Sequence, residues 1–323
     1  MHEVPPWLWA AFAVTVGVAL AVDLLANRRA HVIGLREAAV WSGVWVGLAV
    51  VFGASVFLVV GPTAGVEYTT AWLLEKSLSV DNLFVFALIF GYFQVPREYQ
   101  HRVLFLGVLG ALVFRGLFLA AGVAVVNRFT VVMFVFAAVL FYSSYKILTK
   151  EGDSVDPGRS IAVRLLRKVV PVRDDYAGNR FFLRENGRLV ATPLLAVVTA
   201  VEGADLIFAI DSVPAVLGVS SDIFIVYTSN AFAILGLRAL YFLLADLLDR
   251  FHQLSKGLAL ILALIGVKLA LQASHEIIST GVPEVPSLVG LAVIVVVLAT
   301  SVVLSVVRPA PSGADEAPSG RKP

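Results

Sequence analysis

Long apolar stretches, separated by short polar connections, follow one another along most of the chain. Nine of them are long enough to cross a bilayer, whose hydrocarbon core of about 30 Å needs roughly 20 helical residues. The pattern therefore predicts an all-α membrane protein with about nine transmembrane helices. The predicted spans are 7–26, 38–60, 68–93, 103–126, 129–148, 193–218, 222–244, 257–274 and 287–307, of which 257–274 is the shortest.

The connections between these spans divide the chain into six parts. A pair of N-terminal helices is followed by two groups of three helices, which a long polar connection separates. A last helix and a polar tail, expected to be disordered, complete the chain. The predicted parts are 1–66, 67–148, 149–192, 193–274, 275–308 and 309–323.

The basic residues lie almost entirely in alternate connections. Stretches 27–37, 94–102, 149–192, 245–256 and the segment after 307 hold three, two, nine, two and three of the 25 lysines and arginines. The connections on the opposite side contain a single basic residue, Arg128, and the other five basic residues fall within spans. Because cytoplasmic connections are enriched in lysine and arginine, the pattern predicts an outside N-terminus and a cytoplasmic C-terminus.

Composition narrows the class of protein further. Hydrophobic residues make up 59% of the chain and charged residues 15%, whereas soluble proteins average about 25% charged. There is no cysteine, which excludes disulfides, thiolate metal sites and cysteine nucleophiles. A net charge of +2 gives no reason to expect a nucleic-acid partner.

The connection 149–192 contains the basic, amphipathic stretch "IAVRLLRKVV" at 161–170. Such a segment is typical of helices that lie on an anionic membrane surface. A solvated cytoplasmic loop is an equally good interpretation, and the same loop offers a surface for protein partners.

An internal repeat relates the two groups of three spans. "EKSLSVDN" (75–82) and "DLIFAIDS" (205–212) share their acidic positions, and Arg115 and Arg238 follow in the next spans. Lys146 and Lys268 come 31 and 30 residues after those arginines. Because the first group begins outside and the second begins inside, the repeat of spans 3–5 and 6–8 must be inverted. Inverted repeats with polar helices near the midplane are characteristic of secondary transporters.

Three acids, Glu202, Asp205 and Asp211, lie within the apolar span 193–218. At about 100° per residue, Glu202 and Asp205 share a helix face, whereas Asp211 is displaced by roughly 120°. We therefore expect spans 68–93 and 193–218 to unwind near their acids, helped by Gly203 and Pro214. Carboxylate, amide, hydroxyl and carbonyl oxygens favour a hard divalent cation such as Mg²⁺, Ca²⁺ or Mn²⁺. Asp81, Asn82 and Ser212 add such oxygen ligands.

The basic residues inside the spans have two possible roles. Arg115, Arg238 and Lys268 are predicted to compensate the acids and to contribute to coupling, since intramembrane charges pair with one another. Alternatively, the same pairs merely hold helices together, and Lys146 and Lys268 extend along the protein to the membrane interface.

The motifs "EKSLSVDNLFVF" (75–86), "VEGADLIFAIDSVPAV" (201–216) and "TSNAFAILGLRALYF" (228–242) resemble the TerC/Alx family of bacterial integral membrane proteins. The resemblance extends over about residues 67–272. It implies a manganese exporter of the bacterial cytoplasmic membrane, with Mn²⁺ as the transported ion and a link to tellurium resistance. Carried over position by position, the acidic-motif residues of the family correspond to Glu75, Asp81, Asn82, Glu202, Asp205, Asp211 and Ser212.

Two other classes of function were considered for this sequence: an intramembrane enzyme and a membrane scaffold. An intramembrane aspartyl protease would need two close aspartates, but the glycine-rich context expected around the second is missing from "AIDSVP". We therefore expect no enzymatic activity and no organic cofactor. A membrane scaffold linked to tellurite or envelope stress resistance, acting through 149–192 without transport, is the main alternative. The oligomeric state is left open by the sequence.

Overall fold

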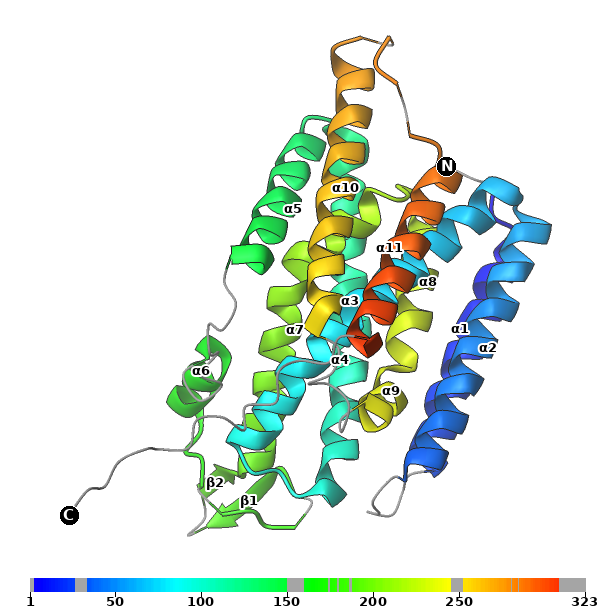
Figure 1. Ribbon diagram of the computed structural model, residues 1–323. Helices are drawn as coiled ribbons and strands as arrows, with labels where there is room; N and C mark the ends of the chain where they lie inside the picture. The colour runs from blue at the N-terminus through cyan, green and yellow to red at the C-terminus, as the bar shows by residue number, and fades with distance from the viewer. Residues whose placement is uncertain are drawn as a thin grey trace.

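The computed structural model describes residues 3–26, 34–149, 160–173, 175–178, 180–185, 188–244, 252–279, 281–283 and 285–307. Most of this chain is helical (Figure 1). The helices are α1 Pro6–Ala26, α2 Leu35–Val59, α3 Pro62–Tyr92, α4 Arg97–Arg128, α5 Val132–Thr149, α6 Ile161–Val169, α7 Pro193–Leu217, α8 Ile223–Leu235, α9 Leu237–Leu244, α10 His252–Ile277 and α11 Ser287–Val307. The strands are β1 Phe182–Glu185 and β2 Arg188–Ala191.

Six helices in the described part of the chain are long and apolar enough to cross a membrane: α2, α4, α5, α7, α10 and α11. The bent pair α8–α9 brings the number of candidate spans to seven if it is one crossing. The apolar part of α1 is shorter, and α3 carries Glu67, Glu75, Lys76 and Asp81 along its 31 residues. The chain is thus a mostly helical membrane protein with six to seven candidate apolar spans.

The long helices pack in a regular way (Figure 1). Helix α3 packs mainly against α8, and α4 mainly against α7, while α3 and α7 also contact each other. Helices α5 and α10 lie side by side along their length. Helix α2 covers α3 and α9, and α11 covers α3 and α10. Figure 1 shows α6 and the β1–β2 hairpin together at one end of this bundle.

Helices α3 and α7 are continuous, so the expected unwinding of spans 68–93 and 193–218 is wrong. Pro214 lies near the end of α7, where the absence of its N–H removes one helical hydrogen bond. Two acids of α7 bind side chains: Asp205 binds Arg115, and Asp211 binds Ser143. Backbone carbonyls released by unwinding are not needed to satisfy them.

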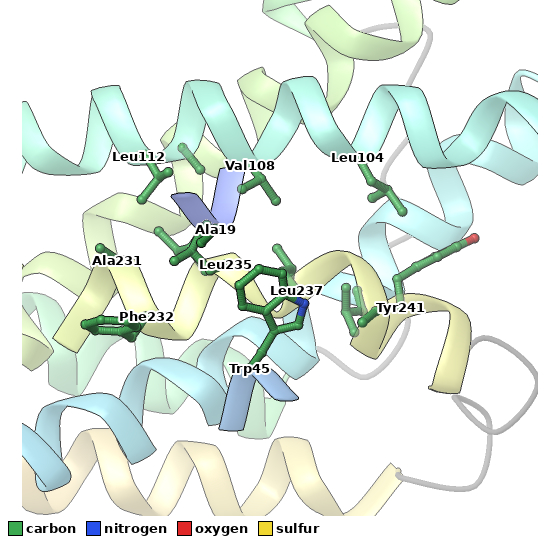
Figure 2. Packing of buried hydrophobic residues seen from close by; sticks show 14 of the residues in the cluster. Ala19, Trp45, Leu104, Val108, Leu112, Ala231, Phe232, Leu235, Leu237 and Tyr241 are labelled. Atoms are coloured by element: carbon green, nitrogen blue, oxygen red, sulfur yellow. The ribbon is translucent and has the colours of Figure 1, made fainter. Parts of the chain in front are cut away.

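The break in a membrane helix occurs instead at Gly236, where α8 gives way to α9 with a bend of 41°. Trp45 of α2 packs against this point, between Leu235 and Leu237 (Figure 2). A Cβ atom at Gly236 would lie 3.0 Å from the Cβ of Trp45 and 2.8 Å from Nζ of Lys76. The break therefore needs glycine because two other helices approach it closely.

The polar connection contains a β-hairpin that the sequence pattern did not predict, and a helix, α6, within the amphipathic stretch 161–170. Strands β1 and β2 form an antiparallel pair in which Phe182 faces Ala191 and Glu185 faces Arg188. Helix α6 begins after Ser160, whose side chain accepts a hydrogen bond of 3.3 Å from the backbone N–H of Val163. The tail 309–323, which we expected to be disordered, lies outside the described residues.

Helices α2 and α3 lie very close together at Gly65. A Cβ atom there would lie 2.7 Å from Cα of Phe57, a backbone atom that cannot swing away. We predict that Gly65→Ala lowers stability by about 1–3 kcal/mol through overpacking. Gly47→Ala on α2 is the control, because nothing lies within 4 Å and alanine favours helix by up to about 1 kcal/mol. Thermal unfolding in detergent measures both, and equal melting temperatures would contradict the prediction.

Candidate functional site

The guanidinium of Arg115 on α4 lies at the centre of a buried cluster of charges. Arg115 is only 2% exposed, and it binds Asp205 of α7 through two hydrogen bonds. Its Nη2 donates to Oδ1 of Asp205 at 2.8 Å and its Nε donates to Oδ2 at 3.2 Å. This two-pronged geometry is the strongest form of arginine–carboxylate pairing and fixes α4 relative to α7.

Helix α3 contributes two further groups to the same guanidinium. Glu75 is fully buried and forms an ion pair with Nη1 of Arg115. With the amide of Asn82 oriented to satisfy both of its groups, its oxygen accepts from Nη2 of Arg115 at 3.1 Å and its nitrogen donates to the Leu78 carbonyl. Arg115 thus connects α3, α4 and α7.

Glu202 lies one turn before Asp205 on the same face of α7, as the spacing predicts. Its carboxylate occupies a notch on α4, since a Cβ atom at Gly110 would lie 2.1 Å from Oε1 of Glu202. Its Oε2 is buried and has no hydrogen-bond partner among the described residues. A side chain at position 110 would displace this carboxylate from its place against α4.

Among the described groups in contact with Arg115 or beside it, negative charge exceeds positive charge. Glu75 and Asp205 bind Arg115, and Glu202 lies one turn from Asp205 against Gly110 of the same helix as Arg115, so three carboxylates share one guanidinium. Lys76, the neighbour of Glu75, donates instead to the carbonyl of Ala233 at 3.1 Å, beside the break between α8 and α9. Unpaired charges are costly in the interior of a membrane protein, so the excess carboxylates need protons or a bound cation.

Asp211 and Ser212 lie farther along α7 and do not join this cluster. Oδ1 of Asp211 accepts a hydrogen bond of 2.5 Å from Ser143 of α5, and the charge of Lys146 acts on the same carboxylate. Ser212 is buried, and its hydroxyl has no hydrogen-bond partner among the described residues. Asp211 and Asp205 therefore point in different directions from α7, as predicted: Asp205 contacts α4 and Asp211 contacts α5.

The remaining predicted site residues lie elsewhere or are not described. The side chain of Asp81 lies outside the described part of the structure, although its backbone belongs to α3. Arg238 is buried on α9, two residues after the break at Gly236. Lys268 of α10 lines a cavity of about 260 Å³ together with Glu67 and Asp222, and Glu67 interacts electrostatically with it.

The described residues contain no ready-made metal shell of three or more carboxylates or histidines. In the cluster, Arg115 stands between Glu75 and Asp205. The guanidinium of Arg115 therefore occupies the position between the acids of α3 and α7 that a metal ion bound by both would take.

Some residues of the site were not identified from the sequence. Gly110, Ser143 and Gly236 contact polar or charged side chains only through the packing of distant segments, and no local pattern marks them. Lys76 lies within the motif "EKSLSVDN", and its charge in an apolar span was a usable signal.

Comparisons with known proteins agree with the resemblance noted in the sequence. The family described as integral membrane protein TerC matches residues 60–311. An uncharacterized membrane protein of Myxococcus xanthus is 42% identical over 97% of both chains. The putative membrane-bound redox modulator Alx of Escherichia coli K12 is 43% identical over 84% of this chain and 88% of its own. The thylakoid membrane protein TERC of Arabidopsis thaliana is 45% identical over 80% of this chain and 66% of its own. No solved structure matches the chain.

Removal of the guanidinium tests the charge cluster. We predict that Arg115→Gln destabilises the protein by about 3–5 kcal/mol, because Glu75 and Asp205 then remain buried without their cation. Adding Asp205→Asn to this variant should restore part of the loss. Arg128→Gln, an exposed change on the same helix, should alter stability by no more than about 0.5 kcal/mol. Thermal unfolding in detergent compares the four proteins, and an Arg115→Gln variant as stable as Arg128→Gln would refute the pairing.

Proposed function

We propose that this chain, which belongs to the TerC family of integral membrane proteins, is a secondary transporter that exports a divalent metal cation from the cytoplasm. Manganese is the ion that the family resemblance favours. The observation that carries the proposal is the excess of buried carboxylates around Arg115, with Glu202 held against Gly110 and one of its oxygens unpaired. Three carboxylates and one guanidinium leave two negative charges unbalanced, which is the charge that one divalent cation neutralises.

Arg115 acts in this proposal as a tethered cation that alternates with the transported ion. When no ion is bound, the guanidinium holds Asp205 and Glu75, which is the arrangement described above. A divalent cation entering beside Glu202 competes with Arg115 for the carboxylate of Asp205. When the ion leaves, Arg115 pairs with Asp205 again, so the empty site does not leave Asp205 without a cation in the membrane interior.

The packing of the long helices supports the proposed inverted repeat. In the repeat, α3 corresponds to α7, α4 to the pair α8–α9, and α5 to α10. Exchanging the two halves converts the α3–α8 contact into the α7–α4 contact, and both are among the most extensive helix contacts of the described chain. The α3–α7 and α5–α10 contacts convert into themselves. Such a twofold relation fits alternating access, in which one half rocks against the other.

The remaining topology is proposed from the same pattern. Nine crossings would comprise α1 and α3 in addition to the candidate apolar spans, with α8 and α9 forming one crossing. The basic connections, including that with α6 and the hairpin, would face the cytoplasm. In a bacterium this places the protein in the cytoplasmic membrane. The domain limits predicted from the sequence follow these crossings.

The ligand chemistry favours manganese or another hard divalent ion. The oxygen donors near Arg115 are carboxylates and an amide, which bind Mn²⁺, Mg²⁺ and Ca²⁺ readily. Asp81, Asp211 and Ser212 would join Glu75, Asn82, Glu202 and Asp205 only if the helices rearrange around the ion. Arg238 and Lys268 would then balance charge elsewhere on the route, Lys268 beside the cavity that holds Glu67 and Asp222. We propose transport rather than catalysis, with no organic cofactor.

A second candidate function comes from the name of the Alx relatives, "putative membrane-bound redox modulator". This chain has no cysteine, so it has no thiols of its own for disulfide exchange. Manganese is itself redox-active, and control of its concentration would give a transporter an indirect redox effect. A scaffold that recruits partners through 149–192 would instead act without Mn²⁺ flux.

The proposal is tested by Mn²⁺ flux into proteoliposomes that contain the purified protein. Glu202→Gln removes the carboxylate with the unpaired oxygen but leaves the pairing of Arg115 with Asp205 in place. We predict that it lowers flux at least about tenfold, equivalent to about 1.4 kcal/mol. Glu185→Gln is the matched control, because Glu185 is an exposed residue of β1.

The two outcomes separate the candidate functions. Wild-type flux that Ca²⁺ or Mg²⁺ reduces, and that Glu202→Gln removes while the melting temperature is kept, supports the transporter. Absence of flux from folded wild-type protein under either direction of pH gradient would leave the scaffold as the better proposal.

A further inference from the structure

Helix α6 exposes a ridge of large apolar side chains. Ile161, Leu165 and Val169 are 74%, 56% and 80% exposed. Their spacing of four residues places them within an arc of roughly 80° on one side of the helix. In a solvated loop, a helix of nine residues would normally pack such a ridge against the protein. Here other residues of α6 pack against the protein instead.

The inward side of α6 is fixed to the site helix α7. Val163 of α6 is fully buried in the main hydrophobic core. Ala162 lies so close to α7 that a Cβ atom at Gly203 would be 2.6 Å from its own Cβ. Gly203 directly follows Glu202 and precedes Asp205 by two residues. Val163 and Ala162 therefore face the bundle, whereas the exposure of Ile161, Leu165 and Val169 shows that the bundle leaves the ridge uncovered.

Basic residues border the apolar ridge. Arg164, Arg167 and Lys168 are exposed and occupy the arc next to it, from roughly 240° to 340° when Ile161 is taken as zero. An apolar ridge flanked by lysine and arginine is the composition that binds the interface of anionic bilayers. Helix α5, which ends at Thr149, carries the exposed side chains of Phe141, Tyr145 and Leu148 towards the same connection. The helix that precedes α6 in the chain, α5, thus also has an exposed apolar and aromatic surface of the kind that faces lipid.

We propose that α6 binds anionic phospholipid in the leaflet at this end of the bundle. Ile161, Leu165 and Val169 enter the boundary between headgroups and acyl chains, and Arg164, Arg167 and Lys168 bind headgroup phosphates. Each basic side chain adds a factor of about five to binding at an anionic surface. Through Ala162 and Gly203, the lipid-bound helix supports the segment of α7 that carries Glu202 and Asp205.

The absence of cysteine from the chain allows a clean spectroscopic test. The full-length protein with Val169→Cys carries a single nitroxide label, and its accessibility to oxygen and to a water-soluble nickel chelate is measured in nanodiscs. With phosphatidylglycerol present, we expect the label to be accessible to oxygen and protected from nickel. In phosphatidylcholine alone, the ratio of the two accessibilities should fall several-fold.

Removing charge from α6 should have the same effect as removing the anionic lipid. Arg167→Gln/Lys168→Gln in the labelled protein is expected to lower the ratio in phosphatidylglycerol nanodiscs. Arg180→Gln/Arg184→Gln, which removes two exposed charges from the same connection, should leave it unchanged. A label that nickel reaches equally in both lipids, or one that responds neither to lipid nor to the α6 charges, would overturn the proposal. This readout does not depend on metal transport.

Discussion

The pairing of one arginine with acids from two other helices is the constraint on which the site depends. Arg115 is almost completely buried, so its charge must be met by protein groups, and Asp205 and Glu75 provide them from α7 and α3. Ion pairs of this kind add little net stability compared with an apolar core, but breaking one is expensive. The pairing thus specifies how α3, α4 and α7 lie together more than it strengthens their packing.

Around this pairing, small residues let helices approach where charges must be placed. Gly110 admits the carboxylate of Glu202, and Gly236 allows α8 to break where Trp45 and Lys76 approach. Lys76 donates to the carbonyl of Ala233, a group near the end of α8 that the break leaves without its helical partner. The charged groups of the bundle interior are therefore paired partly with other side chains and partly with backbone carbonyls at the break between α8 and α9.

Much of the helical pattern was predictable, because long apolar stretches have few alternatives in a bilayer. Each predicted stretch coincides with a helix or with the pair α8–α9, and the expected repeat motifs lie on α3 and α7. The family suggested by the motifs at 75–86 and 201–216 is confirmed. The number of crossings, the orientation and the inverted repeat are still predictions.

The errors have a common physical cause. Unwinding was expected at the acids because local geometry cannot aim Glu202, Asp205 and Asp211 at one point. The structure instead gives Asp205 and Asp211 partners on different helices, Arg115 on α4 and Ser143 on α5. Which side chain meets an acid depends on contacts between segments some 68 to 90 residues apart, and no local spacing encodes them. The same holds for Gly110 and Gly236.

In the proposed transporter, a divalent cation neutralises the excess carboxylates around Arg115. The decisive measurement is equilibrium binding of Mn²⁺ to the purified protein, followed by the loss of the free-ion signal in electron paramagnetic resonance. We expect the wild type and Glu185→Gln to bind Mn²⁺ and Glu202→Gln to lose this binding. Binding that persists unchanged in Glu202→Gln, or a wild type that binds no Mn²⁺, would show that these carboxylates do not hold the ion.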